Sequence, residues 1–403
     1  MAQDWIDAFL DYTGGLPSPE IFRLWAGISA LSGAMERRLF VMSAGKPIYP
    51  NLYVLLVATP GIGKNVIQEV YNLWHEGKCF HVAPHSITKA GLMDSLGEAG
   101  TAKINGDDLV EYHSLLVASP EFGVLVPAHD LEFLSVLNFI YDNPPVTSER
   151  RRWSRDGKEL SIVNPQLTIF AGSQPSYLSS LLPEEAWSMG WTSRLVMVHA
   201  SEGVQIDLHL EAVGTNGAYL HRNKVLWQDL VDRLAALHQM HGVFKWTTPA
   251  LKAAEAWYLD KLPPRPGHSK LTHYLPRRWV TTLKLAMVAS IARADDLVIQ
   301  LDDFDRAREW LLKAEHQMPD IFREMTQRSD TQVIQELHQF CWKAYAKTQR
   351  AMDESHLVHF LQSRIPSEKV MKVLEIAERS NFLMREAGTH LWKPRPAHER
   401  GVE

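Results

Sequence analysis

A short apolar segment that turns abruptly into a glycine-rich loop constrains this chain more than any other feature. Residues 52–57 read LYVLLV, which predicts a buried strand, and the apolar spacing after Val66 predicts a helix. The loop between them, ATPGIGKN, therefore lies at a helix N-terminus, where backbone N–H groups lack intrahelical partners. In a strand-to-helix loop that ends in Gly-Lys, such amides surround a phosphate and the lysine reaches its outer oxygens. The loop thus predicts nucleotide binding.

The loop departs from the usual pattern, G-x-x-x-x-G-K-[ST], at both ends. Ala58 stands at the first position, where an added methyl is tolerated if φ stays negative. Asn65 stands at the last position, where a Ser or Thr hydroxyl normally ligates Mg²⁺, and it offers a neutral carbonyl oxygen instead. ATP and Mg²⁺ remain the expected ligands of the loop, but the sequence leaves open whether ATP is hydrolysed efficiently. The alternative to a nucleotide-binding loop is a plain Pro-Gly turn between a strand and a helix. The expected nucleotide-binding residues are Thr59, Pro60, Gly61, Ile62, Gly63, Lys64, Asn65 and Val66.

Length and composition indicate an ordinary globular protein of two or three domains. The chain has 403 residues, 45% of them hydrophobic and 22% charged, and its net charge of −5 argues against nucleic-acid binding over the whole surface. Two distant cysteines, Cys79 and Cys341, suggest a reducing compartment rather than a disulfide scaffold. The N-terminus lacks a signal pattern, and the apolar runs are too short to span a bilayer. We therefore expect a cytoplasmic protein without membrane association.

The chain reads as four successive parts. The predicted parts are an N-terminal helical segment (1–40), an α/β core with a mostly parallel sheet (41–200), a helical domain (201–328), and a winged-helix-like domain with a tail (329–403). In the last part, three helices followed by two strands around Ala387-Gly388 predict the winged-helix arrangement. The third of these helices, near residues 366–379, mixes three basic residues with three glutamates, so DNA reading and protein contact remain nearly equal alternatives.

Two polar residues follow predicted strands of the core and are candidate catalytic groups. Glu121 follows the buried strand around Leu115–Val117, at the strand edge where ligands bind in open α/β sheets. It is a candidate general base and Mg²⁺ ligand, although Pro120 replaces the acidic residue that usually precedes it. Gln174 follows the strand Gln166–Ala171 and could sense the γ-phosphate or position water. Ordinary strand-end residues are the alternative for both.

Arg194 immediately precedes a third predicted strand, Leu195–His199. An arginine held there after a glycine turn could reach the nucleotide of a neighbouring subunit, where guanidinium stabilises the charge on the transferred phosphoryl group. The alternative is a surface arginine that pairs with a carboxylate.

A basic segment, ERRRWSRDGKE, occupies residues 149–159. Asp156-Gly157 is a hairpin turn signal, and a basic hairpin with one tryptophan could grip phosphates and stack on a base. Because the segment also holds three acidic residues, a solvated surface is the alternative. The candidate DNA-binding residues are Arg150, Arg151, Arg152, Trp153, Arg155 and Lys158.

In their order and approximate spacing, these segments resemble the P-loop ATPases of phage and prophage replication modules, the helicase half of primase-helicase proteins. The resemblance rests on the lead-in PNLY at 50–53, ATPGIGK, ASPEFGVLV, the strand ending GSQP, GWTSRLVMV, and the later stretch THYLPRRWVTTLKLAMVASIARADD. It implies a RecA/AAA+-like core. It also implies roles for Lys64 (phosphate), Glu121 (catalytic carboxylate), Gln174 (sensor), Arg194 (arginine finger in trans), and Arg277 or Arg278 (nucleotide contact from the helical domain).

The resemblance implies a hexameric, ATP-dependent DNA helicase or translocase of mobile-element replication, acting on single-stranded DNA and working with other replication proteins. The alternative is a nucleotide-stabilised helicase loader or replication initiator with slow turnover. Asn65 and Pro120 favour the alternative, whereas Glu121 with Arg194 favours the helicase. A metabolic P-loop kinase is disfavoured by the basic segment and the C-terminal part.

Overall fold

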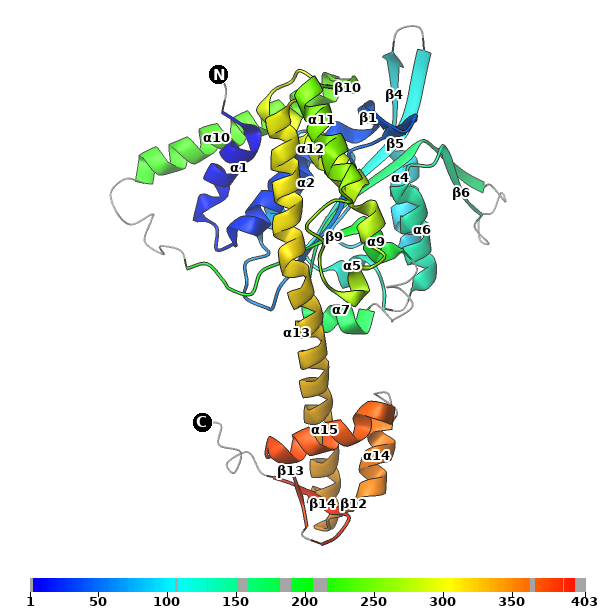
Figure 1. The fold of residues 1–403 in the computed structure, drawn as a ribbon, viewed down its shortest axis with the longest axis vertical. Coiled ribbons are helices and arrows are strands. Elements are labelled where there is room, and N and C mark those ends of the chain that lie inside the picture. Colours follow the sequence, from blue (N-terminus) through cyan, green and yellow to red (C-terminus); the bar gives the residue numbers. More distant parts are fainter. Residues whose placement is uncertain are drawn as a thin grey trace. The chain divides into compact units, whose positions relative to one another are not determined.

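A computed structural model describes residues 3–105, 108–128, 130–150, 159–181, 190–205, 216–362, 367–386 and 388–395 (Figure 1). The chain forms two compact units, Met1–Ile321 and Phe322–Glu403. Among the described residues, none of the helices combines the length and apolarity that crossing a bilayer requires.

The first unit is built on a five-stranded sheet. Its order is β4 (Gly100–Asn105), β5 (Asp108–Ser119), β8 (Pro165–Ser173), β3 (Tyr53–Val57) and β9 (Leu195–His199). Strands β5, β8, β3 and β9 are parallel, and β4 pairs antiparallel with β5 at the edge. The prediction of an α/β core with a mostly parallel sheet is therefore confirmed.

Helices cover both faces of this sheet, which explains why every residue of β3, β8 and β9 is buried. Leu116 of β5 contacts helix α2 (Glu20–Met35) at Gly33. Tyr53 of β3 donates a hydrogen bond to the carbonyl of Leu137 in α6 (Leu131–Tyr141), at 3.0 Å. The strand register places these two side chains on opposite faces, so α2 and α6 sandwich the sheet.

A second sheet has the order β11 (Val298–Ile299), β10 (Gly242–Trp246), β1 (Leu39–Ser43) and β2 (Lys46–Ile48). Strand β10 is parallel to β11 and β1, and β2 forms a hairpin with β1. This sheet joins strands from before the core to strands that lie among the later helices.

Helix α12 (Arg278–Arg293) is almost entirely buried and packs against α1 (Trp5–Tyr12) and α2. The first unit therefore combines the N-terminal helices, the core and most of the later helices. Its other helices are α3 (Val66–Glu76), α4 (Lys89–Glu98), α5 (Phe122–Leu125), α7 (Pro175–Leu181), α9 (Trp191–Arg194), α10 (Asn216–Ala236) and α11 (Thr248–Leu259), and the first part of α13 (Leu301–Thr348) also belongs to it.

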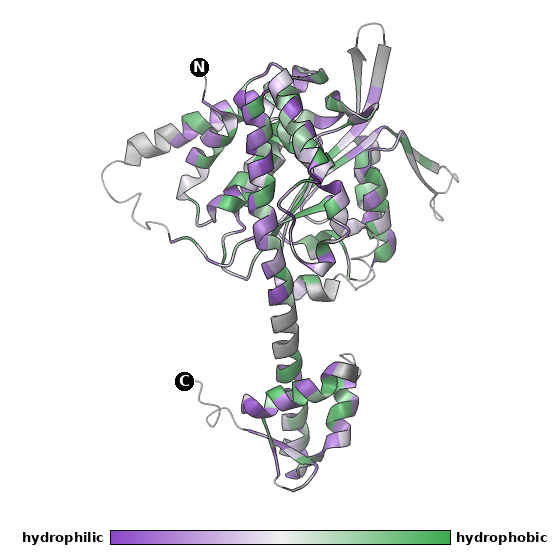
Figure 2. Ribbon diagram, viewed as in Figure 1, coloured by the Kyte–Doolittle hydropathy of each residue, from purple (hydrophilic) through white to green (hydrophobic). Residues whose placement is uncertain are grey.

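The second unit begins within α13 and has its own core. The end of α13 is followed by β12 (Met352–Asp353), α14 (Glu354–Gln362), α15 (Ser367–Arg379), β13 (Leu383–Arg385) and β14 (Leu391–Pro394). The strands form an antiparallel sheet of order β12-β14-β13. Figure 2 shows that α14 and α15 carry both hydrophobic and hydrophilic residues, as amphipathic helices do. Their buried residues pack with Leu337, Cys341 and Trp392.

Candidate functional site

The glycine-rich loop, residues 58–65, connects β3 to α3 at the carboxyl edge of the central sheet. Gly61 has φ +87°, a conformation that glycine adopts without strain. Within the described part of the chain, the amides of Gly63, Lys64 and Asn65 donate to no acceptor. The N-terminus of α3 therefore presents three successive N–H groups that could donate hydrogen bonds to an anion.

Lys64 ties the loop to the end of the neighbouring strand. Its Nζ donates to the carbonyl of Ala58 at 3.0 Å and to the carbonyl of Ser173, the last residue of β8, at 3.1 Å. Burial lowers the pKa of Lys64, and the carboxylate of Glu121 acts in the opposite sense. The ammonium group is thus held by loop carbonyls and lies within electrostatic reach of the predicted catalytic carboxylate.

Gly172 of β8 lies where the backbone of Pro120 and the side chain of Lys64 both approach the strand. A Cβ added at Gly172 would lie 2.4 Å from the carbonyl oxygen of Pro120 and 3.3 Å from Cδ of Lys64. Only glycine therefore allows the backbone before Glu121 and the side chain of Lys64 to approach β8 so closely. Sequence reasoning missed this residue, and the available signal was a glycine near the end of the strand that leads to Gln174.

Glu121 and Gln174 lie at the same edge of the sheet as Lys64. Glu121 is partly buried at the N-cap of α5, and its carbonyl accepts a hydrogen bond from the Ser119 hydroxyl at 3.0 Å. Gln174 follows β8, and its carbonyl accepts the amides of Tyr177 and Leu178 in the first turn of α7. The structure thus brings Lys64, Glu121 and Gln174 to one edge, as strand order predicts.

Asn65 occupies the N-cap position of α3, but its side chain makes no capping hydrogen bond. The residue is exposed. It is therefore accessible to a ligand at the loop, although its side chain has no fixed partner within the helix.

A segment from before the core lies directly on the loop. A Cβ at Gly63 would lie 1.6 Å from the carbonyl oxygen of Pro17, so the two backbones are in close contact. The Ser18 hydroxyl is buried and makes no hydrogen bond with any described residue. Arg23 of α2 fastens the segment by donating to the carbonyl of Ser18 at 3.3 Å. Because this contact joins residues distant in sequence, no local pattern could have predicted it.

Arg194 lies at the amino ends of the parallel strands, whereas the loop lies at their carboxyl ends. It directly precedes β9, whose first residue is in register with Tyr53, the first residue of β3. The five residues of β3 place Arg194 about 17 Å from the loop, at about 3.3 Å per residue. Arg194 therefore does not join the group of residues around Lys64 in the same chain.

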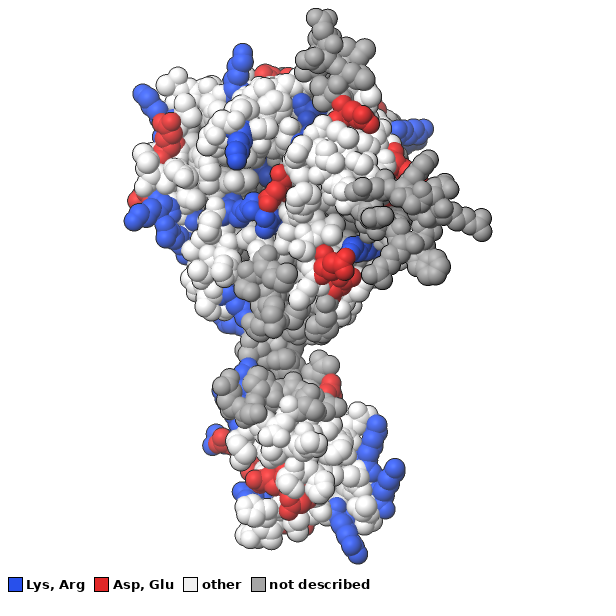
Figure 3. All heavy atoms as spheres, turned by 90° about the vertical axis from the view of Figure 1, so that its right-hand side faces the viewer, with Lys and Arg blue, Asp and Glu red and all other residues white. Residues whose placement is uncertain are grey.

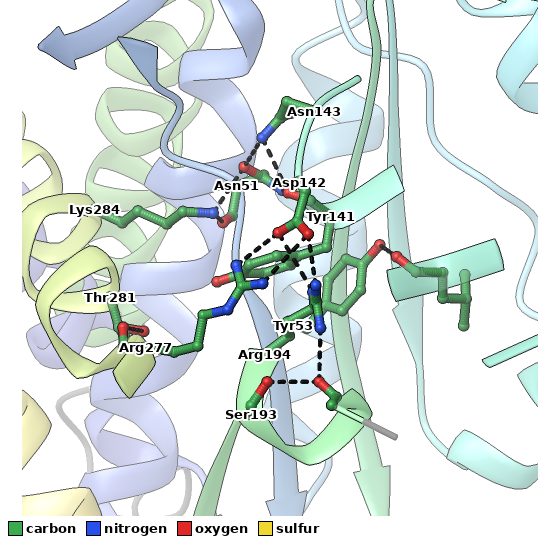
Figure 4. A network of polar contacts seen from close by, with 12 residues as sticks. Asn51, Tyr53, Tyr141, Asp142, Asn143, Ser193, Arg194, Arg277, Thr281 and Lys284 are labelled. Carbon is green, nitrogen blue, oxygen red and sulfur yellow. Dashed lines mark hydrogen bonds and ion pairs between the residues drawn. The ribbon is translucent and has the colours of Figure 1, made fainter. Parts of the chain in front are cut away.

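The Arg194 guanidinium instead binds Asp142, which follows α6 (Figure 4). Its Nη2 lies 2.5 Å from Oδ2 of Asp142, and its Nη1 donates to the carbonyl of Gly190 at 2.9 Å. Within one chain, the structure thus agrees with the alternative that the sequence left open, an arginine paired with a carboxylate.

Arg277 binds the same carboxylate from the helical side. Its Nη1 lies 2.7 Å from Oδ1 of Asp142 and its Nη2 lies 3.3 Å from Oδ2. Arg278, by contrast, is buried and forms a 2.6 Å ion pair with Glu315. The sequence could not distinguish the two arginines, whereas the structure shows one partly exposed and one internal.

A buried lysine lies behind this group. The Nζ of Lys284 in α12 donates to the backbone oxygen of Asn51 at 2.6 Å and to its side-chain oxygen at 2.9 Å, and it lies 3.9 Å from the ring centroid of Tyr141 (Figure 4). Burial lowers the pKa of Lys284 well below its ordinary value, and the carboxylate of Asp142 opposes this. These contacts fix α12 to the lead-in of β3.

The arms of the predicted basic hairpin are β6 (Val146–Arg150) and β7 (Glu159–Val163). These two strands pair antiparallel with Arg150 opposite Glu159, as the arms of a hairpin do, and the expected turn at Asp156-Gly157 lies outside the described residues. The other candidate DNA-binding residues, Arg151, Arg152, Trp153, Arg155 and Lys158, lie outside the described residues. On the face shown in Figure 3, basic and acidic residues of the first unit are interspersed.

No family model matches the chain, and no curated protein is significantly similar to it in sequence.

Proposed function

We propose that this chain binds ATP at residues 58–65 and hydrolyses it within a ring of identical subunits that moves along single-stranded DNA during mobile-element replication. One observation carries the proposal. Three amides at the N-terminus of α3 make no hydrogen bond within the described residues, and they lie beside Lys64 and Glu121 at the carboxyl edge of a parallel sheet. This arrangement suits a triphosphate and a group that activates water.

In the proposed reaction, Lys64 exchanges the carbonyls of Ala58 and Ser173 for phosphate oxygens. Glu121 accepts a hydrogen bond from the attacking water and orients it, and Gln174 contacts the γ-phosphate from the neighbouring strand. Asn65 and Glu121 would hold Mg²⁺ together with the phosphates, and the ion would supply positive charge beside the phosphate oxygens.

A role of Arg194 in hydrolysis requires a site that is shared between subunits. Because Arg194 lies about 17 Å from the loop of its own chain, a nucleotide that it contacts must belong to a second copy. A guanidinium supplied in this way stabilises the charge that spreads over the transferred phosphoryl group. We therefore propose a closed ring, with six subunits expected from the resemblance.

Movement along DNA is the part of the proposal that rests on sequence. The basic segment between β6 and β7 would contact the DNA backbone, and the second unit, with the helices and hairpin of a winged helix, would bind DNA or another replication protein.

A nucleotide-stabilised helicase loader or initiator is the second candidate. The observation that favours it is the covered loop, since Pro17 contacts Gly63 and Lys64 is already bonded to carbonyls. Lys64 must leave these carbonyls before it contacts a phosphate, which would slow turnover.

The experiment that separates these candidates measures ATP hydrolysis with and without single-stranded DNA, together with the mass of the assembly. A translocase should hydrolyse ATP faster on DNA and only when assembled. Nucleotide-dependent assembly without turnover would favour the loader. Absence of any nucleotide effect would contradict both candidates.

A further inference from the structure

A groove between the end of α11 and the start of α12 combines exposed aromatic and apolar side chains. Tyr258 and Leu259, the last two residues of α11, are 53% and 78% exposed. The ring centroid of Trp279 in α12 lies 5.0 Å from that of Tyr258. The groove has a volume of about 580 Å³, and its other lining residues are Lys261, Leu262, Arg265, Leu275, Pro276 and Arg278. Single exposed apolar side chains are common, but an aromatic pair at a groove of this size indicates a binding surface.

The charged residues that line the groove are all cations. Lys261 and Arg265 are exposed, and neither forms an ion pair with another described residue. The third cation, Arg278, is buried and already paired with Glu315. Asp260, the acidic neighbour of Lys261 in sequence, is exposed and does not line the groove. The accessible charge in the groove therefore complements an anion.

One turn carries both exposed cations. Lys261 and Leu262 have φ +62° and +60°, in the left-handed region that residues other than glycine seldom adopt. The amide of Leu262 donates to the carbonyl of Trp257 at 2.9 Å, and Nε of Arg265 donates to the carbonyl of Lys261 at 2.9 Å. These bonds hold the turn against α11, and they leave the Nζ of Lys261 and both Nη groups of Arg265 without a partner among the described residues.

Aromatic rings beside unpaired cations are the combination that binds single-stranded nucleic acid. A base stacks on an aromatic ring whatever the sequence, because every base has a π-face, and the phosphates are attracted to Lys and Arg. Because Tyr258, Lys261 and Arg265 line one groove, a base and a neighbouring phosphate can bind there together. An acidic peptide would match the cations, but it would not need the exposed aromatic pair.

We propose that this groove binds single-stranded DNA, with a base against Tyr258 and Trp279 and backbone phosphates on Lys261 and Arg265. The inference rests on the proposed function, because it takes DNA as the partner, but it requires neither ATP nor a ring. It adds a DNA contact that is separate from the basic segment between β6 and β7.

The first experiment measures the affinity of the full chain for a fluorescein-labelled oligothymidylate, without nucleotide, at several salt concentrations. The double variant Lys261→Ala, Arg265→Ala should bind at least about tenfold more weakly, and its slope of log affinity against log salt concentration should fall by about 1.4 units, at about 0.7 per phosphate contact. Lys252→Ala is the matched control, because Lys252 is an exposed lysine of α11 that does not line the groove, and its affinity and slope should stay those of the wild type.

The aromatic contact is tested by two variants of one residue. Tyr258→Leu keeps an apolar side chain but removes the ring, so affinity should fall about tenfold with an unchanged salt slope, whereas Tyr258→Phe keeps the ring and should bind as the wild type does. Melting temperatures confirm that each variant folds. Unchanged affinity in Tyr258→Leu would overturn the inference, and binding of a labelled polyglutamate peptide that only the double charge variant weakens would assign the groove to an acidic protein instead.

Photocrosslinking places the strand directly. An oligonucleotide that contains 5-iodouracil should crosslink, in the wild-type protein, to a peptide that holds Tyr258 or Trp279, and crosslinks confined to other peptides would overturn the inference. Failure of the inference can be distinguished from failure of the proposed function. A protein that binds the oligonucleotide through this groove but neither binds nor hydrolyses ATP contradicts only the proposed function, whereas an ATPase that DNA stimulates equally in wild type and groove variants contradicts only the inference.

Discussion

Replacing Gly172 by alanine should damage catalysis more than stability. The added Cβ would lie 2.4 Å from the carbonyl oxygen of Pro120, whereas ordinary contacts of a Cβ begin at 3.4 Å. The backbone before Glu121 must therefore recede by about 1 Å, and a displacement of that size at a catalytic group costs about 10² in rate. Overpacking of the same region should lower the free energy of unfolding by about 1–3 kcal/mol.

The assay combines steady-state ATP hydrolysis with thermal unfolding and a titration of ATP binding. Gly267→Ala is the matched control, because a Cβ there meets no atom within 4 Å. We expect a kcat about two orders of magnitude lower for Gly172→Ala, in a protein that still folds, and wild-type behaviour for Gly267→Ala. Wild-type kcat in Gly172→Ala would refute the idea that this glycine sets the position of Glu121.

Three further predictions address the metal ligand, the basic segment and the buried lysine. Asn65→Thr should raise kcat or lower the Mg²⁺ concentration that hydrolysis requires, because a hydroxyl is the usual ligand at that position; a loss of activity in a folded protein would show that Asn65 has a fitted role of its own. Because the folded chain holds Lys284 with a lowered pKa, the unfolded chain binds more protons there, so stability should rise with pH up to about 10.4, the ordinary pKa of lysine. Melting temperatures measured against pH should show a shallower rise for Lys284→Met, and an unchanged slope would contradict this reasoning. After alanine replaces Arg150, Arg151, Arg152 and Arg155, the slope of log DNA affinity against log salt concentration should become smaller by nearly one unit per lost phosphate contact. An identical slope in the variant would favour the interpretation of the segment as a solvated surface.

The parts of the fold that the sequence predicts are those governed by local patterns. The apolar run before the loop becomes β3, the helix after it becomes α3, and the strands that precede Glu121 and Gln174 become β5 and β8. Because parallel strands share one carboxyl edge, this order is enough to bring Lys64, Glu121 and Gln174 together.

The features that the sequence does not predict depend on contacts between distant segments. Pro17 meets Gly63, Gly172 meets Pro120, and Asp142 receives two arginines, yet none of these pairs has a periodic signal or a fixed spacing.

The central claim is that residues 58–65 bind ATP through Lys64, and a calorimetric titration tests it most directly. Lys64→Ala should weaken ATP binding at least tenfold, about 1.4 kcal/mol or more, while Lys313→Ala, which removes an exposed lysine paired with Glu309, should leave the affinity unchanged. Equal affinity in the wild-type protein and in Lys64→Ala, with both proteins folded, would contradict the assignment of this loop as the nucleotide site.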